Sequence, residues 1–169
     1  MIIVMYDAEV KLKLIMGLGN AGARYAHTYH NAGHLFADFA GERFKTHSAT
    51  CNVLKNDGFM NEAGAFVKKA LKKRGARPEE LLIAHDDSDI ALGEYTYSFG
   101  RGSAGHKGVA SVIAAIGTKN FLRLRIGIRP RALIRRKAEL FVLKPISAAH
   151  QKTLEDVFVR AAKKLATHC

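Results

Sequence analysis

Short apolar segments alternate with longer amphipathic segments along the chain, and this alternation limits the fold more than any other feature of the sequence. The apolar segments have the length of strands, whereas the amphipathic segments repeat apolar side chains at the three- and four-residue spacing of a helix. We expect strands at 12–16, 51–54, 81–85, 94–99 and 121–128. We expect helices at 31–44, 61–74, 109–116 and 148–167. Strands that alternate with helices predict an α/β fold, in which helices cover both faces of one sheet.

The size and charge of the chain narrow the class of its partner. Its 169 residues are typical of one domain, with 1–11 as an N-terminal extension and 12–169 as the folded part. A composition of 48% apolar and 25% charged residues excludes a disordered or collagen-like chain. Lys and Arg outnumber Asp and Glu by 27 to 15, a net charge of +12, which favours nucleic acid over a merely solvated basic surface. Because the chain has no Trp, we expect recognition of backbone and shape rather than base stacking.

The cysteines and the N-terminus indicate the compartment. Cys51 and Cys169 have neither a CxxC spacing nor a histidine cluster, so they do not predict a zinc site. We interpret them as reduced thiols of a cytosolic protein. The apolar run at 1–6 is too short for the core of a signal peptide and lacks a basic start, and no stretch has the length of a membrane span. We therefore expect a cytoplasmic protein without a membrane segment.

A first group of candidate residues follows the strand at 12–16. Gly17 and Gly19 lie at its end, where they either cradle a phosphate or form a tight turn. Asn20 either caps this turn or binds a ligand. His30 lies at the start of a helix, whose positive end should lower the pKa of the imidazole and favour the neutral, basic form. The alternative is an ordinary packed or exposed histidine.

An acidic group follows the strand at 81–85. Its sequence is HDDSD over residues 85–89, with three carboxylates in four residues. Three interpretations are open at this point. The carboxylates could hold Mg²⁺, one of them could orient a histidine and stabilise its charged form, or the segment could be an ordinary turn rich in Asp.

A glycine-rich, basic group follows the strand at 94–99. Its positive donors are Arg101, His106 and Lys107. Together with Arg123 and Arg125 on the next strand, these side chains predict an anion-binding surface. Further along, the segment 129–137 holds five basic residues and is interpreted either as a solvated loop or as part of the same electrostatic footprint.

The combination and order of these segments resemble bacterial-type peptidyl-tRNA hydrolase. The matching segments are GLGNAGARYAHTYHNAG (17–33), FMNEAG (59–64), LLIAHDDSD (81–89), GSAGHKG (102–108), FLRLRIGI (121–128) and VLKPIS (142–147). The resemblance covers about residues 12 to 160. It implies a single-domain, three-layer α/β/α fold with a mixed, mostly parallel sheet. It also implies hydrolysis of the ester between a peptide and tRNA, which recycles tRNA from stalled translation, in a monomer that needs no metal, no organic cofactor and no protein partner.

The resemblance assigns catalytic roles to four residues. His30 matches the general base that activates water, and Asp86 matches the acid that orients this histidine. Asn20 and Asn61 match the asparagines that hold the peptide and position the water or the developing oxyanion. The chemistry fits these roles, because an ester is already activated and a carboxamide donates to an oxyanion without titrating.

The resemblance assigns binding roles to further residues. The sequence also departs from the family pattern at several positions. Tyr25 and Met60 match residues that line the cleft, and Arg125 matches a basic residue that grips tRNA phosphate. Lys107 stands where the family has the Asn of HNG, so a donor and acceptor becomes a cation that can only donate. Ser98 stands where a basic residue is expected, and Arg101 is the candidate to replace it.

Smaller departures are Ala21 for the proline of GLGNPG, Ser103 for a histidine, a shorter stretch between His30 and Asn61, and a clipped C-terminal helix. The retained motif residues favour an enzyme. The main alternative is a non-catalytic RNA-binding relative that keeps the fold and the basic face, which Lys107 favours. A third possibility is hydrolysis of a different ester or amide.

Overall fold

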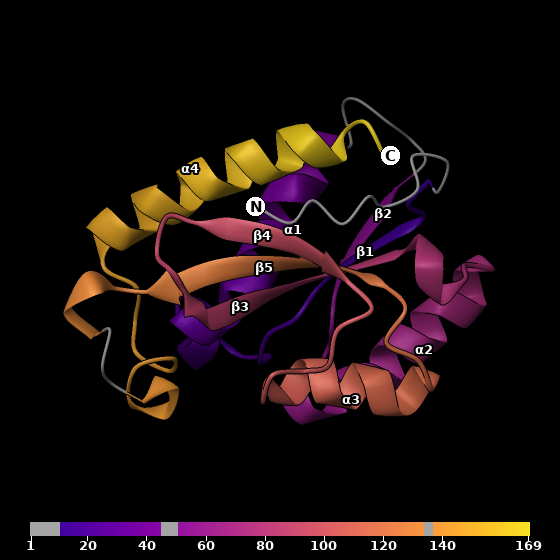
Figure 1. Ribbon diagram of the computed structural model, residues 1–169, viewed down its shortest axis with the longest axis horizontal. Coiled ribbons are helices and arrows are strands. Elements are labelled where there is room, and N and C mark those ends of the chain that lie inside the picture. Colours follow the sequence, from indigo (N-terminus) through magenta and orange to yellow (C-terminus); the bar gives the residue numbers. More distant parts are fainter. Residues whose placement is uncertain (1–10, 45–50, 134–136) are drawn as a thin grey trace.

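Five strands form one sheet in the order β2-β1-β3-β5-β4 in a computed structural model that describes residues 11–44, 51–133 and 137–169 (Figure 1). The strands are β1 (Leu14–Gly17), β2 (Asn52–Lys55), β3 (Leu81–Ala91), β4 (Tyr95–Phe99) and β5 (Leu122–Arg129). The α-helices of the described residues are α1 (Ala32–Phe44), α2 (Ala63–Arg74), α3 (Lys107–Ile116) and α4 (Ala148–Leu165). The first four strands of this order run parallel, whereas β4 runs antiparallel to β5. The expected mixed, mostly parallel sheet is therefore confirmed.

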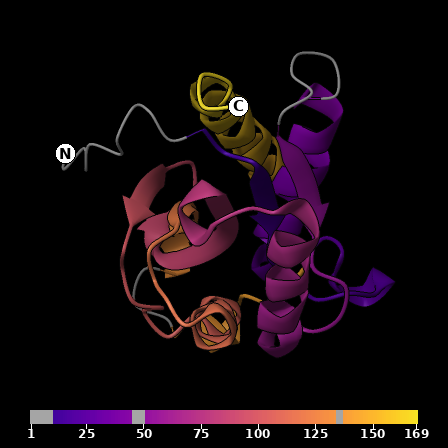
Figure 2. The same ribbon diagram turned by 90° about the vertical axis from the view of Figure 1, so that its right-hand side faces the viewer.

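The helices cover the sheet in two layers. Helices α1 and α4 lie on one face, and α2 and α3 lie side by side on the other (Figures 1 and 2). Along β3, Leu82 and Ala84 pack toward α1 and α4, whereas Leu81 and Ile83 pack toward α2 and α3. All four side chains are fully buried, which explains why this strand is apolar at successive positions rather than at alternate ones.

Glycines let α1 pack directly against the strand ends. A Cβ on Gly33 would lie 2.3 Å from the carbonyl oxygen of Ala84, and a Cβ on Gly17 would lie 2.2 Å from the carbonyl oxygen of Gly33. A Cβ on Gly19 would lie 2.5 Å from the ring of His34. The glycines after β1 are thus required by close packing against α1, which fixes the residues just before this helix relative to β3.

The end of β3 differs from the expected one, and some of the expected features fall on residues that the structure does not describe. The strand expected at 81–85 continues through the acidic residues as far as Ala91, because β5 continues to pair with it across an irregularity between Asp87 and Ala91. The extension at 1–11, apart from Lys11, lies outside the described residues, as do Arg135 and Arg136 of the basic run. No helix in the described part of the chain is both long and apolar enough to cross a membrane.

The two cysteines form a disulfide, so the prediction of reduced thiols is wrong. Cys51 lies just before β2 and Cys169 ends the chain after α4, yet their Cα atoms are only 5.3 Å apart. The fold brings them together because the backbone N–H of Leu12 donates to the carbonyl oxygen of His168, which places the C-terminal turn beside the start of β1. A separation of 118 residues hides this proximity in the sequence.

The disulfide should contribute measurably to stability, because a cross-link over so long a loop restricts the unfolded chain strongly. We predict that Cys169→Ser lowers the free energy of unfolding by about 2–4 kcal/mol. Urea unfolding without reductant, compared for the two proteins, measures the difference. Addition of dithiothreitol should destabilise the parent chain and leave Cys169→Ser unchanged. Equal stability of the parent chain with and without reductant would contradict a stabilising disulfide.

Candidate active site

A cleft of about 750 Å³ opens at the carboxyl ends of the parallel strands, where sites of α/β sheets gather. Its wall includes residues from the turn before α1, the end of β3, the turn Met60–Glu62, the glycine-rich loop before α3 and the segment 138–143. Of the residues singled out in the sequence, it brings together His30, Asp86, Asn20, Asn61, Met60 and Lys107.

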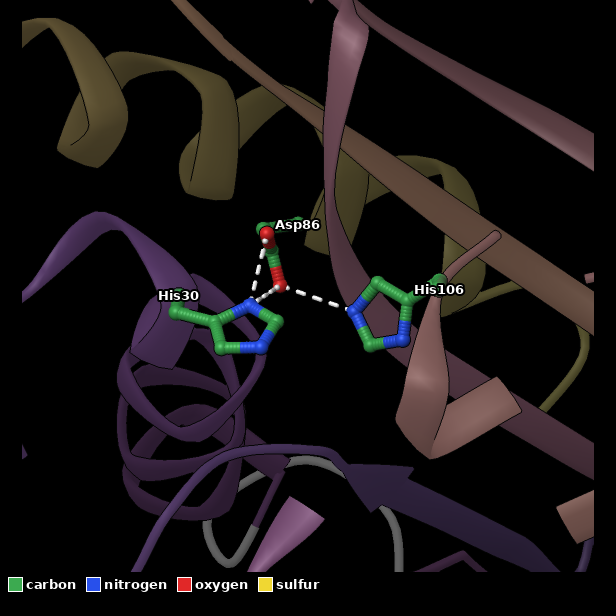
Figure 3. A group of neighbouring side chains, drawn as sticks. All are labelled: His30, Asp86 and His106. Carbon is green, nitrogen blue, oxygen red and sulfur yellow. Dashed lines mark hydrogen bonds and ion pairs between the residues drawn. The ribbon is translucent and has the colours of Figure 1, made fainter. Parts of the chain in front are cut away.

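His30 and Asp86 form the centre of the cleft. His30 lies in the turn Tyr29–Asn31, and its backbone N–H donates to the carbonyl oxygen of Val142 at 2.8 Å. Its ring Nδ1 lies 2.9 Å and 3.0 Å from the two carboxylate oxygens of Asp86 (Figure 3). Because a carboxylate only accepts, Nδ1–H is the donor, and the other nitrogen, Nε2, keeps its lone pair. Nε2 points away from Asp86 and has no partner among the described residues.

Asp86 has a second imidazole partner, which the sequence analysis did not place in the catalytic group. The Nε2–H of His106 donates to Oδ1 of Asp86 at 2.9 Å (Figure 3). The Nδ1 of the same ring accepts from the backbone N–H of Val109 at 3.2 Å, so His106 is the N-cap of α3. These two hydrogen bonds fix its neutral tautomer. The motif HKG carried the signal, but His106 was interpreted there only as a positive donor.

The charges of this group decide its pKa values. Burial alone would raise the pKa of Asp86, but His106 and His30 lower it, and the net shift is well below the usual value. Burial lowers the pKa of His30, but the hydrogen bond and charge of Asp86 raise it, with a smaller lowering by Lys107, and the net shift is upward. The expectation of a lowered pKa at the helix start is therefore wrong, because the adjacent carboxylate outweighs the other effects.

His85 packs against His106 and Asp86 in the interior of the protein. Its ring is buried and lies 4.7 Å from the ring of His106, measured between centroids. Burial, then the proximity of His106, holds the pKa of His85 well below its usual value. Its Nδ1–H donates to the carbonyl oxygen of Asp86 at 2.7 Å. His85 is therefore a neutral packing residue rather than a second base.

The amide of Asn20 is held in one orientation by the neighbouring motif. Its Oδ1 accepts from the backbone N–H of Met60 at 2.8 Å. Its backbone exchanges two hydrogen bonds with the side chain of Asn31, both at 2.9 Å. Its NH₂ group has no partner among the described residues and is available to a ligand in the cleft. Asn61 is exposed beside it, while its carbonyl oxygen accepts from Ser111 of α3 at 2.7 Å.

The rest of the cleft wall combines a cation with apolar side chains. Lys107 begins α3 and is exposed at the cleft. Phe59 and Leu143 also line it and are 50% and 53% exposed. Neither residue is predicted as part of the site from the sequence, because a single apolar residue in a loop carries no pattern.

Three expected binding residues lie outside the cleft wall. Tyr25 contacts the cleft residue Phe59, with the two rings edge-to-face at 6.4 Å between centroids. The side chain of Arg125 is 16% exposed, and its Nε donates to Asp87 at 2.7 Å. Arg101 is exposed on the loop after β4.

A basic cluster nevertheless forms beside the cleft. Arg123 is buried opposite Ser98 in the register of β4 and β5, and it donates to the carbonyl oxygen of Gly102 at 2.8 Å. Burial, then the charges of Arg125 and Arg101, lowers the pKa of Arg123 to about 10. The positive charges of Arg125 and Arg101 thus both act on Arg123, and an anion bound near Arg123 would relieve this repulsion.

The acidic residues after His85 do not converge on a magnesium site. Asp86 faces two histidines, Asp87 pairs with Arg125, and Asp89 is exposed. Within the described ranges, the group of metal-ligating atoms that do converge consists of His30, Asp86 and His106, within 4.8 Å of one another. Of the interpretations of the acidic group, the geometry matches the acid that orients a histidine.

The chain is similar to known proteins in both sequence and structure. Residues 14–169 match the sequence model described as Peptidyl-tRNA hydrolase. The chain is 36% identical over 168 residues to the peptidyl-tRNA hydrolase of Mycobacterium leprae strain Br4923, covering 89% of this chain and 83% of that protein. It is also 36% identical over 167 residues to that of Mycobacterium ulcerans strain Agy99, covering 88% and 86%. A crystal structure of peptidyl-tRNA hydrolase from Acinetobacter baumannii matches with a TM-score of 0.80 and 29% identity, covering 93% of this chain and 88% of that one.

The shared carboxylate yields a direct prediction for the imidazole. Replacing Asp86 by Asn removes the negative charge that stabilises protonated His30, so the pKa of His30 should fall. Titration of the histidine ring protons by NMR measures this pKa, with exposed His27 as the internal control. An unchanged pKa of His30 in Asp86→Asn would show that the carboxylate does not stabilise its charged form.

Proposed function

The chain belongs to the peptidyl-tRNA hydrolase family and hydrolyses peptidyl-tRNA, and we propose that His30 is the general base of this reaction. One observation carries the assignment. The side chain of His30 lines the cleft, and its Nδ1–H donates to the Asp86 carboxylate. This hydrogen bond leaves the lone pair of Nε2 free to accept a proton. A histidine held in this tautomer can accept a proton from water, and its raised pKa makes it a stronger base than a free imidazole.

The proposed reaction uses one proton twice. Nε2 of His30 takes a proton from water, and the oxygen of that water attacks the ester carbonyl to give a tetrahedral oxyanion. The bond between the carbonyl carbon and the ribose oxygen then breaks, and the leaving oxygen takes the proton back from Nε2. Between these steps His30 is positively charged, and the Asp86 carboxylate stabilises that charge. His106 keeps Asp86 in place as a positioning residue.

Five side chains are proposed to act on the ester and the peptide. Asn20 offers an unpaired NH₂ in a fixed orientation, and Asn61 offers an exposed amide with both a donor and an acceptor. Lys107 can donate to the developing oxyanion. Phe59 and Leu143 would cover the peptide side chains without selecting a sequence, because apolar contacts accept side chains of different shapes. The amides of Asn20 and Asn61 would hold the peptide backbone.

We propose that the basic cluster binds tRNA phosphate. The net charge of +12 and the action of the Arg101 and Arg125 charges on Arg123 support this role. Arg101 is the better candidate for a direct contact, since Arg125 is already paired with Asp87. Ser98 is buried and cannot take the place of a basic residue.

The remaining proposals concern context. Because peptidyl-tRNA arises in translation, we propose that the protein acts in the cytoplasm. We further propose that it works as a monomer without an obligate protein partner. Residues 12–169 would form the hydrolase domain, with 1–11 as an extension to it.

The proposed base is tested by His30→Ala. We expect the rate of hydrolysis of a defined peptidyl-tRNA to fall by about 10²–10⁴-fold, the usual contribution of a general base. Affinity for tRNA should stay within a few-fold, because it depends on Lys and Arg. Turnover and filter binding of the purified proteins measure the two quantities, with His27→Ala as a matched exposed control. Undiminished turnover would remove His30 from the mechanism, and a parent chain that binds tRNA without turnover would favour the non-catalytic RNA-binding relative.

Lys107→Asn tests the largest departure from the family pattern. The positive charge of Lys107 lowers the pKa of His30, so its removal should raise that pKa. Hydrolysis needs neutral His30, and the acidic limb of the pH–rate profile should therefore move to higher pH. Asn can also donate and accept, so we expect a higher rate at neutral pH.

The control for this variant is Lys73→Asn, which removes an equal charge from an exposed position at the end of α2. It should leave the acidic limb in place. If Lys107→Asn instead leaves the limb in place but weakens tRNA binding and reduces its dependence on salt, Lys107 contacts phosphate rather than influencing the base.

A further inference from the structure

Two imidazoles and one carboxylate converge in the cleft with the chemistry of a metal site. Nδ1 of His30 and Nε2 of His106 each lie 2.9 Å from Oδ1 of Asp86, and ligand atoms of the three residues all lie within 4.8 Å of one another (Figure 3). They come from three separate parts of the fold: the turn before α1, strand β3 and the N-cap of α3. Two histidines with one acidic residue are a donor set that binds Zn²⁺ in sites where one coordination position stays open.

We propose that His30, Asp86 and His106 form a binding site for Zn²⁺ or a similar divalent transition-metal ion, and that an ion held there inhibits the hydrolase. The inhibitory part rests on the proposed role of His30 as the base. The ion is not a cofactor in this proposal. It competes with the protons that join the three side chains in the working enzyme.

The geometry requires only side-chain adjustment. Zn²⁺ binds imidazole nitrogen and carboxylate oxygen at about 2.0–2.2 Å, which puts neighbouring ligand atoms of a tetrahedral site roughly 3.4 Å apart. The two 2.9 Å separations from Asp86 to the imidazoles would widen by a few tenths of an ångström, and the imidazole nitrogens would move closer together. We assign both changes to rotation of the three side chains.

The protons of both rings must move when the ion binds. In His30 the proton leaves Nδ1 and is placed on Nε2, and in His106 it leaves Nε2 and is placed on Nδ1, so no proton is gained or lost overall. His106 then no longer accepts from the N–H of Val109, a hydrogen bond that is already long at 3.2 Å. This loss and the nearby charge of Lys107 make the site weaker than a closed structural zinc site.

Inhibition follows from the new tautomer of His30. With the ion on Nδ1, the proton occupies Nε2, the nitrogen that should accept a proton from water. The ring then has no free lone pair toward the cleft. Mg²⁺ should not have this effect, because it prefers oxygen ligands and octahedral coordination.

His106→Asn separates the metal site from the fold. Asn is a favoured N-cap residue whose oxygen can accept from Val109, so α3 keeps its cap while the imidazole ligand is lost. His27→Asn is the matched control, since His27 is exposed and lies outside the cleft wall. Both variants and the parent chain are titrated with Zn²⁺ against a chromogenic zinc indicator. The titration uses tag-free protein without reductant, so that Cys51 and Cys169 stay joined and do not bind the ion.

We expect the parent chain and His27→Asn to bind one Zn²⁺ with equal affinity, and His106→Asn to bind at least about tenfold more weakly, since loss even of an outer-shell partner costs that much. The inhibition constant for hydrolysis at fixed Mg²⁺ should equal the dissociation constant from the titration. Equal Zn²⁺ affinity in His106→Asn and the parent chain, no Zn²⁺ binding by the parent chain, or an unchanged rate with the site filled would each overturn the proposal. The titration contains no tRNA, so a parent chain that binds Zn²⁺ but lacks hydrolase activity would contradict the proposed function and leave the metal site standing.

Discussion

A carboxylate buried within a strand must be compensated by hydrogen-bond donors, and Asp86 obtains them from two imidazoles. This shared acceptor determines the orientation and the pKa of the catalytic imidazole. It holds His30 with one nitrogen bound and the other left for a water molecule, and it raises the pKa of that ring while its own pKa falls. It also joins the turn before α1 to the start of α3, so the two sides of the cleft meet at a single side chain.

The fold supports this arrangement through close packing rather than through a flexible loop. Gly33 lets α1 approach the backbone of Ala84, two residues before Asp86, which brings His30 to the carboxylate. Gly108 lets α3 approach the side chain of Met60, since a Cβ on Gly108 would lie 2.5 Å from the sulfur of Met60. The glycines of the motifs therefore set the spacing between the catalytic side chains, although none of them touches the substrate in the proposed reaction.

Much of the architecture follows from the sequence, because period and length identify each strand and helix. The sequence could not show that β3 continues through the acidic residues, since this depends on pairing with β5. It could not show the disulfide between Cys51 and Cys169, which only the folded chain brings together. The motif residues of the cleft were predicted from the resemblance, whereas the second partner of Asp86 was not. A histidine that caps a helix and binds a carboxylate looks, in sequence, like any basic residue near a glycine.

The central claim is that one imidazole, held by Asp86, limits the reaction through its protonation. The most direct test compares two pKa values of the free parent chain: the acidic limb of kcat/KM for peptidyl-tRNA hydrolysis, and the NMR titration of His30. The account predicts that the two values coincide and that both lie above the ordinary value of a histidine. A rate that stays constant through the pH range in which His30 titrates would contradict it.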